Sequence, residues 1–289
     1  MMSSDLTQDS RISRVVELAL IEDVGLGDLT SEALVSETSI GHAEILCKED
    51  GVIAGNEIAA LVFRHCDQTI TLEPVVRDGN RALAGDVVAR VNGRAKGILT
   101  GERTALNFLQ RMSGIATLTR RYVDAVEGTA AKITDTRKTV PGLRVLDKLA
   151  VRLGGGSNHR FGLDDMVLIK DNHVFAVGGI RRAVQRCRDH LTARNIQVAL
   201  EVETKNLEEV LEAVGCEGIS RIMLDNFPLS DMRRAVELVG GRVELEASGG
   251  ITLDTVRMYA ETGVDLISIG ALTHSAKALD LSLELTSHV

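Results

Sequence analysis

The stretch VALEVETKNLEEVLEAVGCEGISRIMLDN, residues 198–226, decides the fold. It contains two short apolar runs, at 198–202 and 221–224, and the segment between them has the spacing of a helix over 206–214. A strand, a helix and a second strand in this order form a βαβ unit, in which the two strands are parallel. The same alternation continues on both sides of this stretch.

Four more apolar runs extend the pattern: AKIT (131–134), MVLI (166–169), VELEA (243–247) and DLISI (265–269). Further helices are expected over 142–153, 178–189, 228–239 and 252–261. A doubly wound open sheet would usually show a GxGxxG turn after its first strand, and that turn is missing. We therefore expect an α/β barrel of parallel strands, left incomplete (open) because only six units are evident.

The first hundred residues follow another rhythm. The spacing predicts helices over 10–22 and 55–65, and alternation predicts strands at 42–47, 70–72 and 86–91. Thr100 has the character of an N-cap for a helix running through ERTALNFLQRM. Short strands mixed with helices predict a separate α/β layer ahead of the barrel.

Bulk composition excludes several classes of function. The formal net charge is −8 and aromatic residues make up 2% of 289, which argues against general binding to nucleic acid or to an anionic membrane. The four cysteines form no CxxC pair and favour a reduced, cytoplasmic protein. Residues 1–10 lack the features of a signal peptide, and no apolar run is long enough to span a bilayer.

Charged or glycine-rich groups close every apolar run, and a barrel would gather them on one face. Residues 132–170 reverse the global charge, with eight Lys or Arg against four acids. Arg137, Lys138, Arg160 and Lys170 occupy strand-end or loop positions, where Arg binds carboxylates with two hydrogen bonds and Lys binds phosphate. The helical spacing of other cations indicates a solvated face: Arg144, Lys148 and Arg152.

Acidic and glycine-rich strand ends leave alternatives open. Glu201, Glu203 and Asp225 are suited to hold Mg²⁺, to bind ribose hydroxyls or to stabilise a developing cation, although Glu203 alone is as well explained by an ion pair with a lysine of the site. The turns ASGGI (247–251), with an expected N-cap at Thr252, and SIGALTHS (268–275) suit a phosphate site or are simply tight turns.

A glycine-rich loop, two histidines and a pair of acids complete the set of candidate residues. The loop GGGSNH (154–159) suits either an anion site or a linker. His159 is expected to hydrogen-bond in the pocket and His173 to be structural, and Asp164-Asp165 is expected to cap or solvate a loop.

Nine segments together resemble the type II phosphoribosyltransferases and, within them, the quinolinate phosphoribosyltransferase family. They are EDVGLGDLTS (22–31), KEDGVIAG (48–55), LTGERTALNFLQRMSGIATLT (99–119), DTRKTVPGLR (135–144), GGGSNHRFGLDDMVLIKDNH (154–173), EVE (201–203), MLDN (223–226), EASGGI (246–251) and SIGALTHS (268–275). Val140 departs from the family pattern, which often has a second Thr there.

The resemblance implies a fold and an assembly. It implies an N-terminal α/β sandwich over 1–115, joined by the C-terminal residues 276–289, and an incomplete α/β barrel over 116–275. It also implies a homodimer in which Arg103 reaches into the active site of the partner subunit.

The resemblance further implies phosphoribosyl transfer from phosphoribosyl pyrophosphate to quinolinate, with loss of CO₂ and with Mg²⁺. Arg137, Lys138, His159 and Arg160, with Thr136 beside them, would hold the two carboxylates, and Lys170 would meet phosphate. Lys138, Glu201 and Asp225 would be catalytic, with Glu201 and Asp225 near the ribose and the metal. The 5′-phosphate would bind Ser248, Gly249, Gly250, Ser268, Ile269 and Gly270.

Four other functions compete with this one. Two are paralogues of the same fold: a protein associated with molybdate transport and a nicotinate-specific phosphoribosyltransferase. A Schiff-base aldolase would use Lys170 at its strand end, and a dimeric binding module would have no catalysis. The type I phosphoribosyltransferases are excluded, because their strand ending in paired acids and their Thr-Gly-Gly-Thr loop do not occur.

Overall fold

A computed structural model describes residues 9–288. Residues 1–8, on which the expectation of no signal peptide rests, lie outside the described residues. The chain forms two compact units. Of the described residues, the first contains 9–120, 139–155 and 272–288, and the second contains 121–138 and 156–271. No helix within residues 9–288 is both long enough and apolar enough to cross a membrane.

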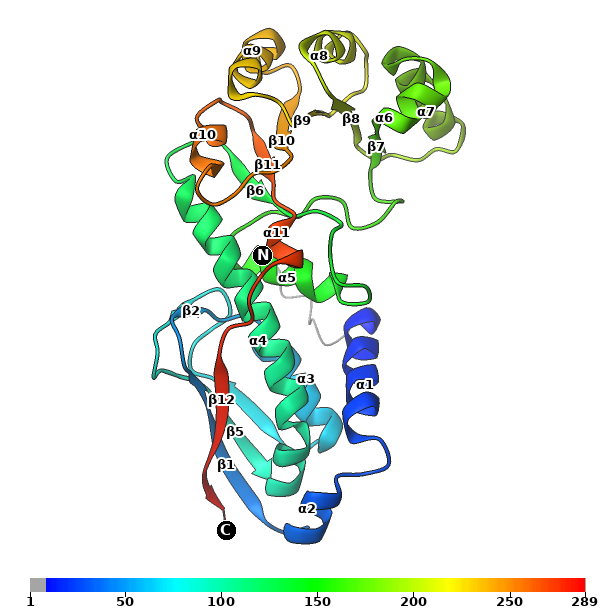
Figure 1. The fold of residues 1–289 in the computed structure, drawn as a ribbon. Coiled ribbons are helices and arrows are strands. Elements are labelled where there is room, and N and C mark those ends of the chain that lie inside the picture. Colours follow the sequence, from blue (N-terminus) through cyan, green and yellow to red (C-terminus); the bar gives the residue numbers. More distant parts are fainter. Residues whose placement is uncertain (1–8, 289) are drawn as a thin grey trace. The chain divides into compact units, whose positions relative to one another are not determined.

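The first unit is built around an antiparallel sheet in the order β12-β1-β5-β3 (Figure 1). Alternation along β1 buries Ala43, Ile45 and Cys47 on one face, as the sequence predicted. The strands of this unit are β1 (Ile40–Cys47), β2 (Gly51–Val52), β3 (Thr71–Pro74), β4 (Arg81–Ala82), β5 (Val87–Arg94) and β12 (Leu281–His288). The chain end thus returns to pair with β1, Cys47 opposite Leu281.

Helices complete the first unit, and most match the predicted segments. They are α1 (Ser10–Val24), α2 (Leu29–Leu34), α3 (Asn56–Cys66), α4 (Ala95–Ala125, of which residues 121–125 belong to the second unit), α5 (Arg144–Leu153) and α11 (Ala271–His274, beginning at the unit boundary). Arg111 on α4 donates two hydrogen bonds to the buried Asp147 on α5, from Nε to Oδ1 at 2.9 Å and from Nη2 to Oδ2 at 2.8 Å. This two-bond pair explains why residues 139–155 cluster with the first unit, although the sequence division placed them in the barrel.

The predicted start of the long helix at Thr100 is wrong. Helix α4 begins at Ala95, and the Thr100 hydroxyl donates to the Lys96 carbonyl one turn earlier, at 3.0 Å, and to Asp28. A threonine inside a helix satisfies its hydroxyl in this way, so its presence did not mark a helix end. The predicted boundary at residue 115 falls within this helix.

The second unit contains six parallel strands in the order β6-β11-β10-β9-β8-β7. Each strand from β8 to β11 lies beside the strand before it in the sequence, and β6 lies beside β11, so the chain winds in one direction, as in a barrel. In the part of the chain that the structure describes, β6 and β7 are not paired with each other, which leaves the barrel open. The expected fold class, an α/β sandwich domain with an incomplete barrel, is confirmed.

Apolar strands explain why this sheet is buried. Val202, Ile222, Leu224, Ala247 and Ile267 are fully buried, and each large apolar side chain removed from water contributes about 1.5–3 kcal/mol. The strands are β6 (Lys132–Thr134), β7 (Val167–Ile169), β8 (Leu200–Thr204), β9 (Arg221–Asp225), β10 (Glu244–Ser248) and β11 (Leu266–Ser268).

The outer helices of the second unit are α6 (Asp171–Val177), α7 (Ile180–Ala193), α8 (Leu207–Val214), α9 (Leu229–Val239) and α10 (Val256–Ala260). Three departures concern these helices and α5. Gly178-Gly179 separates α6 from α7, and the sequence predicted only the second of these helices. Thr252 is not an N-cap, because α10 begins four residues later at Val256. Lys148 on α5 is buried, so the predicted solvated face is wrong at that position.

Candidate active site

A pocket of about 350 Å³ opens at the carboxyl ends of the six parallel strands. All six strand ends contribute to it, as expected for a barrel. Its lining consists of Thr136, Arg137, Lys138, His159, Arg160, Leu168, Lys170, Glu203, Met223, Asp225, Glu246, Ser248 and Ser268. The structure therefore brings together nine of the residues that the sequence predicted for the site.

Two arginines share the wall of this pocket that follows β6 and precedes β7. Partial burial and the nearby charge of Arg137 lower the pKa of Arg160. Arg160 is held in place, because Nη1 donates to the Met166 carbonyl at 3.0 Å. Two like charges brought together in a half-buried pocket favour an anionic ligand between them, since an anion relieves both the repulsion and the desolvation.

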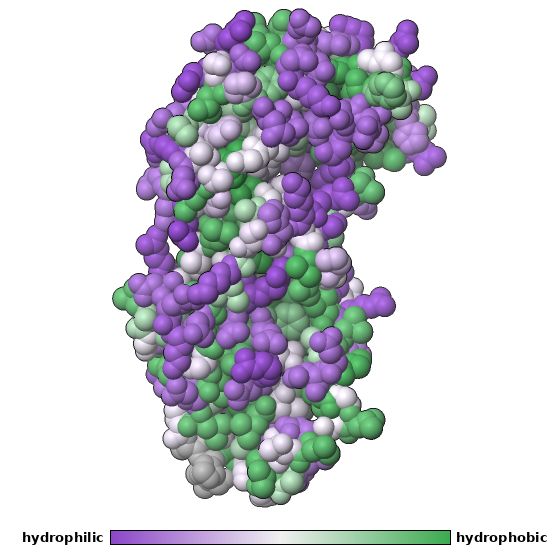
Figure 2. All heavy atoms as spheres, in the orientation of Figure 1, coloured by the Kyte–Doolittle hydropathy of each residue, from purple (hydrophilic) through white to green (hydrophobic). Residues whose placement is uncertain are grey.

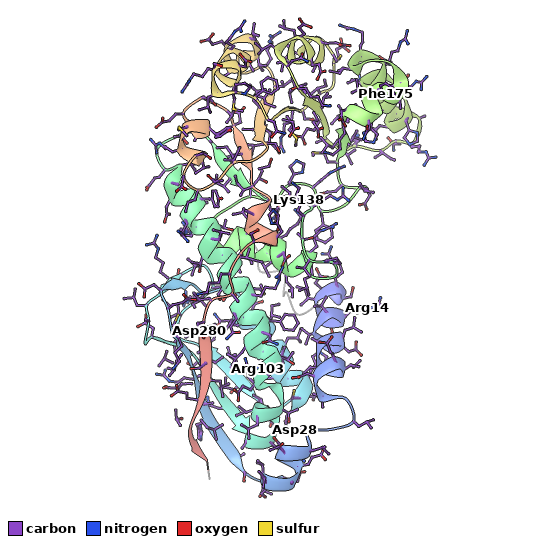
Figure 3. The ribbon with its side chains drawn as sticks, in the orientation of Figure 1. Arg14, Asp28, Arg103, Lys138, Phe175 and Asp280 are labelled. Carbon is purple, nitrogen blue, oxygen red and sulfur yellow. The ribbon has the colours of Figure 1, made fainter. Side chains whose placement is uncertain are left out.

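Lysines extend this positive wall on either side. Lys138 follows Arg137 in the loop after β6 (Figure 3), and its backbone N–H donates to the Thr136 hydroxyl at 3.0 Å. Lys170 ends β7, and its Nζ lies 2.6 Å from Oε2 of Glu203 on β8. The ion pair that the sequence left as an alternative for Glu203 is thus present.

Asp225 and Ser248 end neighbouring strands and meet at a strained turn. Asn226 has a φ of 57°, donates its backbone N–H to the Ser248 carbonyl at 2.8 Å, and donates Nδ2 to Asp225 Oδ2 at 3.0 Å. Gly249 has a φ of 102°, and a Cβ there would lie 2.2 Å from the Asn226 side-chain oxygen. Asn226 was absent from the predicted site, although its position after β9 in the MLDN segment was a usable signal.

The predicted phosphate turns are only partly in the pocket. Ser248 and Ser268 line it, whereas Gly249, Gly250, Ile269 and Gly270 flank these serines in the chain without lining it. The Ile269 side chain is buried, and its backbone N–H already donates to the Thr134 carbonyl at 2.9 Å. Because α10 begins only at Val256, the turn at Gly249-Gly250 does not lead directly into a helix N-terminus.

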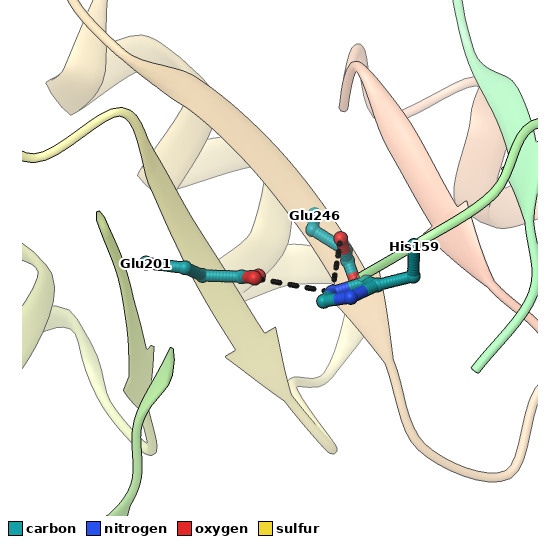
Figure 4. Close-up of side chains that lie close together, drawn as sticks. All are labelled: His159, Glu201 and Glu246. Atoms are coloured by element: carbon teal, nitrogen blue, oxygen red, sulfur yellow. Dashed lines mark ion pairs between the residues drawn. The ribbon is translucent and has the colours of Figure 1, made fainter. Parts of the chain in front are cut away.

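His159, Glu201 and Glu246 form a buried cluster (Figure 4), and two of its members, His159 and Glu246, line the pocket. Nε2 of His159 lies 3.1 Å from Oε2 of Glu201 and 3.5 Å from Oε2 of Glu246. Arg221 Nη1 contacts the same Glu246 oxygen at 3.0 Å. Burial and the charge of Glu201 raise the pKa of Glu246 to about 7.

This cluster alters two expectations. Glu201 is fully buried and does not line the pocket, so the structure does not place it against ribose or metal. Nδ1 of His159 accepts the Arg160 backbone N–H at 2.8 Å and Nε2 faces the two glutamates, so neither nitrogen is directed at a substrate carboxylate. Glu246 is a second residue that the sequence analysis missed, and an acid inside the apolar run VELEA was the signal for it.

The remaining predicted residues have simpler places. Arg103 is exposed on α4 in the first unit and is labelled in Figure 3. His173 accepts the Lys170 backbone N–H at 3.0 Å and closes the start of α6, so it is structural, as expected. Asp165 accepts the Phe161 backbone N–H at 2.7 Å within its loop, which is the capping role that the sequence favoured.

Mg²⁺ would fit part of this site. This ion usually takes one or two carboxylates together with substrate phosphates and keeps several waters. Asp225 presents a carboxylate to the pocket and fits that pattern, whereas Glu201 is fully buried and does not line the pocket.

Comparison with known proteins agrees with this architecture. The profile described as the C-terminal domain of quinolinate phosphoribosyl transferase matches residues 115–284, and the profile of its N-terminal domain matches residues 28–113. "Quinolinate phosphoribosyltransferase [decarboxylating] 1" of Nicotiana glauca is 46% identical over 290 residues, which cover 95% of this chain and 82% of that protein.

Bacterial relatives match over nearly their whole length. "Probable nicotinate-nucleotide pyrophosphorylase [carboxylating]" of Bacillus subtilis is 43% identical, covering 96% of this chain and 94% of that one. The crystal structure of NadC from Streptococcus pyogenes is 39% identical, with a TM-score of 0.91 and 96% of each chain covered. On these matches and on the fold and site described above, the chain belongs to the quinolinate phosphoribosyltransferase family.

Proposed function

We propose that this protein catalyses the reaction of quinolinate with phosphoribosyl pyrophosphate to give nicotinate mononucleotide, pyrophosphate and CO₂, a step of de novo NAD biosynthesis. The observation that supports this proposal most is the meeting of Arg137, Lys138, Arg160 and Lys170 around one pocket. Quinolinate carries two carboxylates and the second substrate carries phosphates. An acidic protein needs such a local concentration of positive charge to bring these anions together.

Arginine and lysine would take different parts of the substrates. Arg137 and Arg160 share one wall, and their planar guanidinium groups suit the carboxylates of quinolinate. Lys138 would bind beside them, near Thr136. Lys170, which pairs with Glu203, would meet the pyrophosphate as a point charge.

Bond changes then follow from this placement. The pyridine nitrogen attacks the anomeric carbon, and the bond from that carbon to the pyrophosphate oxygen breaks. The anomeric centre develops positive charge, which the carboxylates of Asp225 and Glu203 in the pocket lining would stabilise. The ribosylated ring nitrogen is cationic, so its positive charge stabilises the electron pair that the departing CO₂ leaves on the adjacent carbon. A proton then replaces the carboxylate on that carbon.

Mg²⁺, held by Asp225 and by phosphate oxygens of the substrate, would neutralise charge on the leaving pyrophosphate. The serines at the strand ends, Ser248 and Ser268, would hydrogen-bond the 5′-phosphate, and Gly249 and Gly250 would let the backbone approach it. Asn226 would keep Asp225 oriented through its 3.0 Å contact.

A second copy of the chain would complete the site by supplying Arg103. An exposed apolar surface on the first unit supports association: Leu26, Leu29 and Leu34 are largely exposed, and apolar atoms gather over α1 and α2 in Figure 2. Exposed apolar patches of this kind mark interfaces between proteins. We also propose a reducing, cytoplasmic location, which the four free cysteines support.

A substrate panel tests the activity. Purified protein with Mg²⁺ and phosphoribosyl pyrophosphate is offered quinolinate, nicotinate or nicotinamide, and the nucleotide product is measured by mass spectrometry. We expect nicotinate mononucleotide from quinolinate alone. Turnover of nicotinate without quinolinate turnover would assign the nicotinate-specific alternative, and binding of molybdate without any turnover would favour the transport-associated paralogue.

A further inference from the structure

Four ionisable side chains form a cluster of which His159 and Glu246 line the pocket while Glu201 and Arg221 do not, and substrate binding does not explain all of them. Glu201 on β8 and Glu246 on β10 are both fully buried. His159 lies between them, and one ligand-type atom of each of the three residues lies within 4.8 Å of the others. Arg221 on β9 reaches Glu246 at 3.0 Å and also the exposed Glu244 at 3.1 Å.

The hydrogen bond at Nδ1 of His159 indicates which ring nitrogen carries the proton. The Arg160 backbone N–H donates to Nδ1 at 2.8 Å, so Nδ1 offers a lone pair and carries no hydrogen. A flipped ring would instead oppose a C–H to that N–H and leave the amide without its acceptor. The imidazole is therefore neutral, and its single proton is on Nε2, which faces Glu201 and Glu246.

Glu201 and Glu246 have no exposed surface, and two ionised carboxylates so close together are strongly disfavoured. Arg221 divides its positive charge between Glu246 and the exposed Glu244, and Arg160 acts on Glu201. Burial and the neighbouring Glu201 raise the pKa of Glu246 to about 7.

We propose that Glu246 stays protonated beside an ionised Glu201, and that the two hold His159 as a neutral imidazole which braces Arg160 through its backbone instead of binding substrate. His159, Glu201 and Glu246 are positioning residues in this scheme. The loop is held from its other side by Asp135, which is buried and accepts the His159 backbone N–H at 2.8 Å and Asn158 Nδ2 at 2.7 Å. The arginine that faces the substrate is thereby fixed by buried contacts.

A metal ion is the rival occupant of this cluster. One histidine and two carboxylates are a common set of ligands. A metal would need the lone pair of Nε2, however, and that atom carries the proton whenever Nδ1 accepts from the backbone. The hydrogen-bond pattern therefore favours a shared proton over a bound ion.

Nitrogen NMR of histidine-labelled protein tests the tautomer without any assay of activity. The signals of His159 are assigned by their loss in His159→Asn. We expect the neutral form with hydrogen on Nε2 from pH 6 to pH 8. A charged ring at pH 6, or hydrogen on Nδ1, would overturn the proposal, and so would one equivalent of a transition metal in protein purified without chelator.

Thermal unfolding tests the proton on Glu246. The groups that face it are Glu201 from β8, His159 from the loop before β7 and Arg221 from β9, with the Ser268 hydroxyl on β11. The folded-state pKa of about 7 lies above the ordinary 4.5, so the folded protein binds this proton more tightly and its stability falls as pH rises from 4.5 through 7. Glu246→Gln cannot lose a proton there. The Tm of the wild type relative to this variant should fall between pH 5.5 and 8, and a constant difference would refute the assignment.

A kinetic experiment, which rests on the proposed function, distinguishes support of Arg160 by His159 from direct contact between His159 and the substrate. Asparagine places an oxygen where Nδ1 lies, so His159→Asn retains the acceptor for the Arg160 N–H, whereas His159→Ala loses it. We expect the KM for quinolinate to rise about tenfold more in the alanine variant than in the asparagine variant. Equal KM values would contradict bracing. If neither the wild type nor the variants turn over, the proposed function fails while the NMR result stands by itself.

Discussion

Lys170 Nζ and Glu203 Oε2 lie 2.6 Å apart in the lining of the pocket, at the ends of two neighbouring strands of the barrel. Lys170 is about half exposed, at 46%, so water screens the pair and its contribution to folding is small. In the proposed reaction, a phosphate of the substrate would attract the Lys170 ammonium group away from Glu203.

Lys170→Ala should therefore raise the KM for phosphoribosyl pyrophosphate by roughly 10- to 100-fold, the range for losing a charged hydrogen bond. Stability should change little. Lys205 gives a matched control, because it forms a similar exposed pair with Asp171 at 2.7 Å but does not line the pocket. If Lys205→Ala raises the KM as much, the effect belongs to general surface charge and not to the site.

Arg137→Ala should act on the other substrate. A carboxylate of quinolinate loses a two-bond partner, so its KM should rise by about 10- to 100-fold, and Arg137→Lys should recover only part of this because lysine cannot form the planar pair. Steady-state kinetics with quinolinate varied gives the result. Arg188→Ala on α7, outside the pocket, is the control. An unchanged quinolinate KM in Arg137→Ala would show that Arg137 does not bind a carboxylate of quinolinate.

Gly249 and Gly250 provide a steric comparison within one turn. In Gly249→Ala the new Cβ would meet the Asn226 side chain and the residue would have a φ near 102°, so the turn must move. In Gly250→Ala nothing lies within 4 Å of the new atom, and only the φ of 61° opposes it. We expect Gly249→Ala to lose more activity and to be less stable by about 1–3 kcal/mol more. Equal losses of Tm would show that the contact with Asn226 is unimportant.

A shared site predicts complementation between two inactive variants. In a dimer of one Arg103→Ala chain and one Lys170→Ala chain, one site would combine the intact Lys170 with the partner subunit's intact Arg103. Dimers purified through two different tags should recover about half of the wild-type activity, because one of the two symmetric sites is whole. No recovery in verified mixed dimers would show that Arg103 acts within its own chain or not at all.

Removal of the metal should stop the reaction. Chelation of Mg²⁺ with EDTA is expected to abolish turnover, and excess Mg²⁺ should restore it. Asp225→Asn should raise the Mg²⁺ concentration needed for half-maximal activity, since a carboxylate ligand becomes a neutral amide. Full activity of metal-free protein would contradict this part of the proposal.

Sequence periodicity predicted the sheet well because the strands are short apolar runs between amphipathic helices. Each predicted barrel strand overlaps an observed one. The start of α4 was not predicted because the Thr100 hydroxyl forms its hydrogen bond inside the helix. Helix α6 was not predicted because it is short and follows β7 after a single residue, Lys170. Local sequence patterns do not contain the tertiary contacts that decide where these helices begin.

Strand ends likewise predicted which residues line the pocket, but not how deep each one lies. Glu201 and Glu203 are on the same side of β8, yet only Glu203 reaches the pocket. Depth along the barrel axis depends on the register between strands, which a single sequence does not specify. The burial of Lys148 and the pairing of Glu246 with Arg221 depend on the same three-dimensional information.

Release of CO₂ tests the central claim most directly. Quinolinate labelled in the carboxylate next to the ring nitrogen is incubated with the protein and Mg²⁺, with or without phosphoribosyl pyrophosphate. We expect labelled CO₂ only when phosphoribosyl pyrophosphate is present, in equal amount to nicotinate mononucleotide. If folded protein released no labelled CO₂ with both substrates and Mg²⁺ present, the proposed reaction would be contradicted.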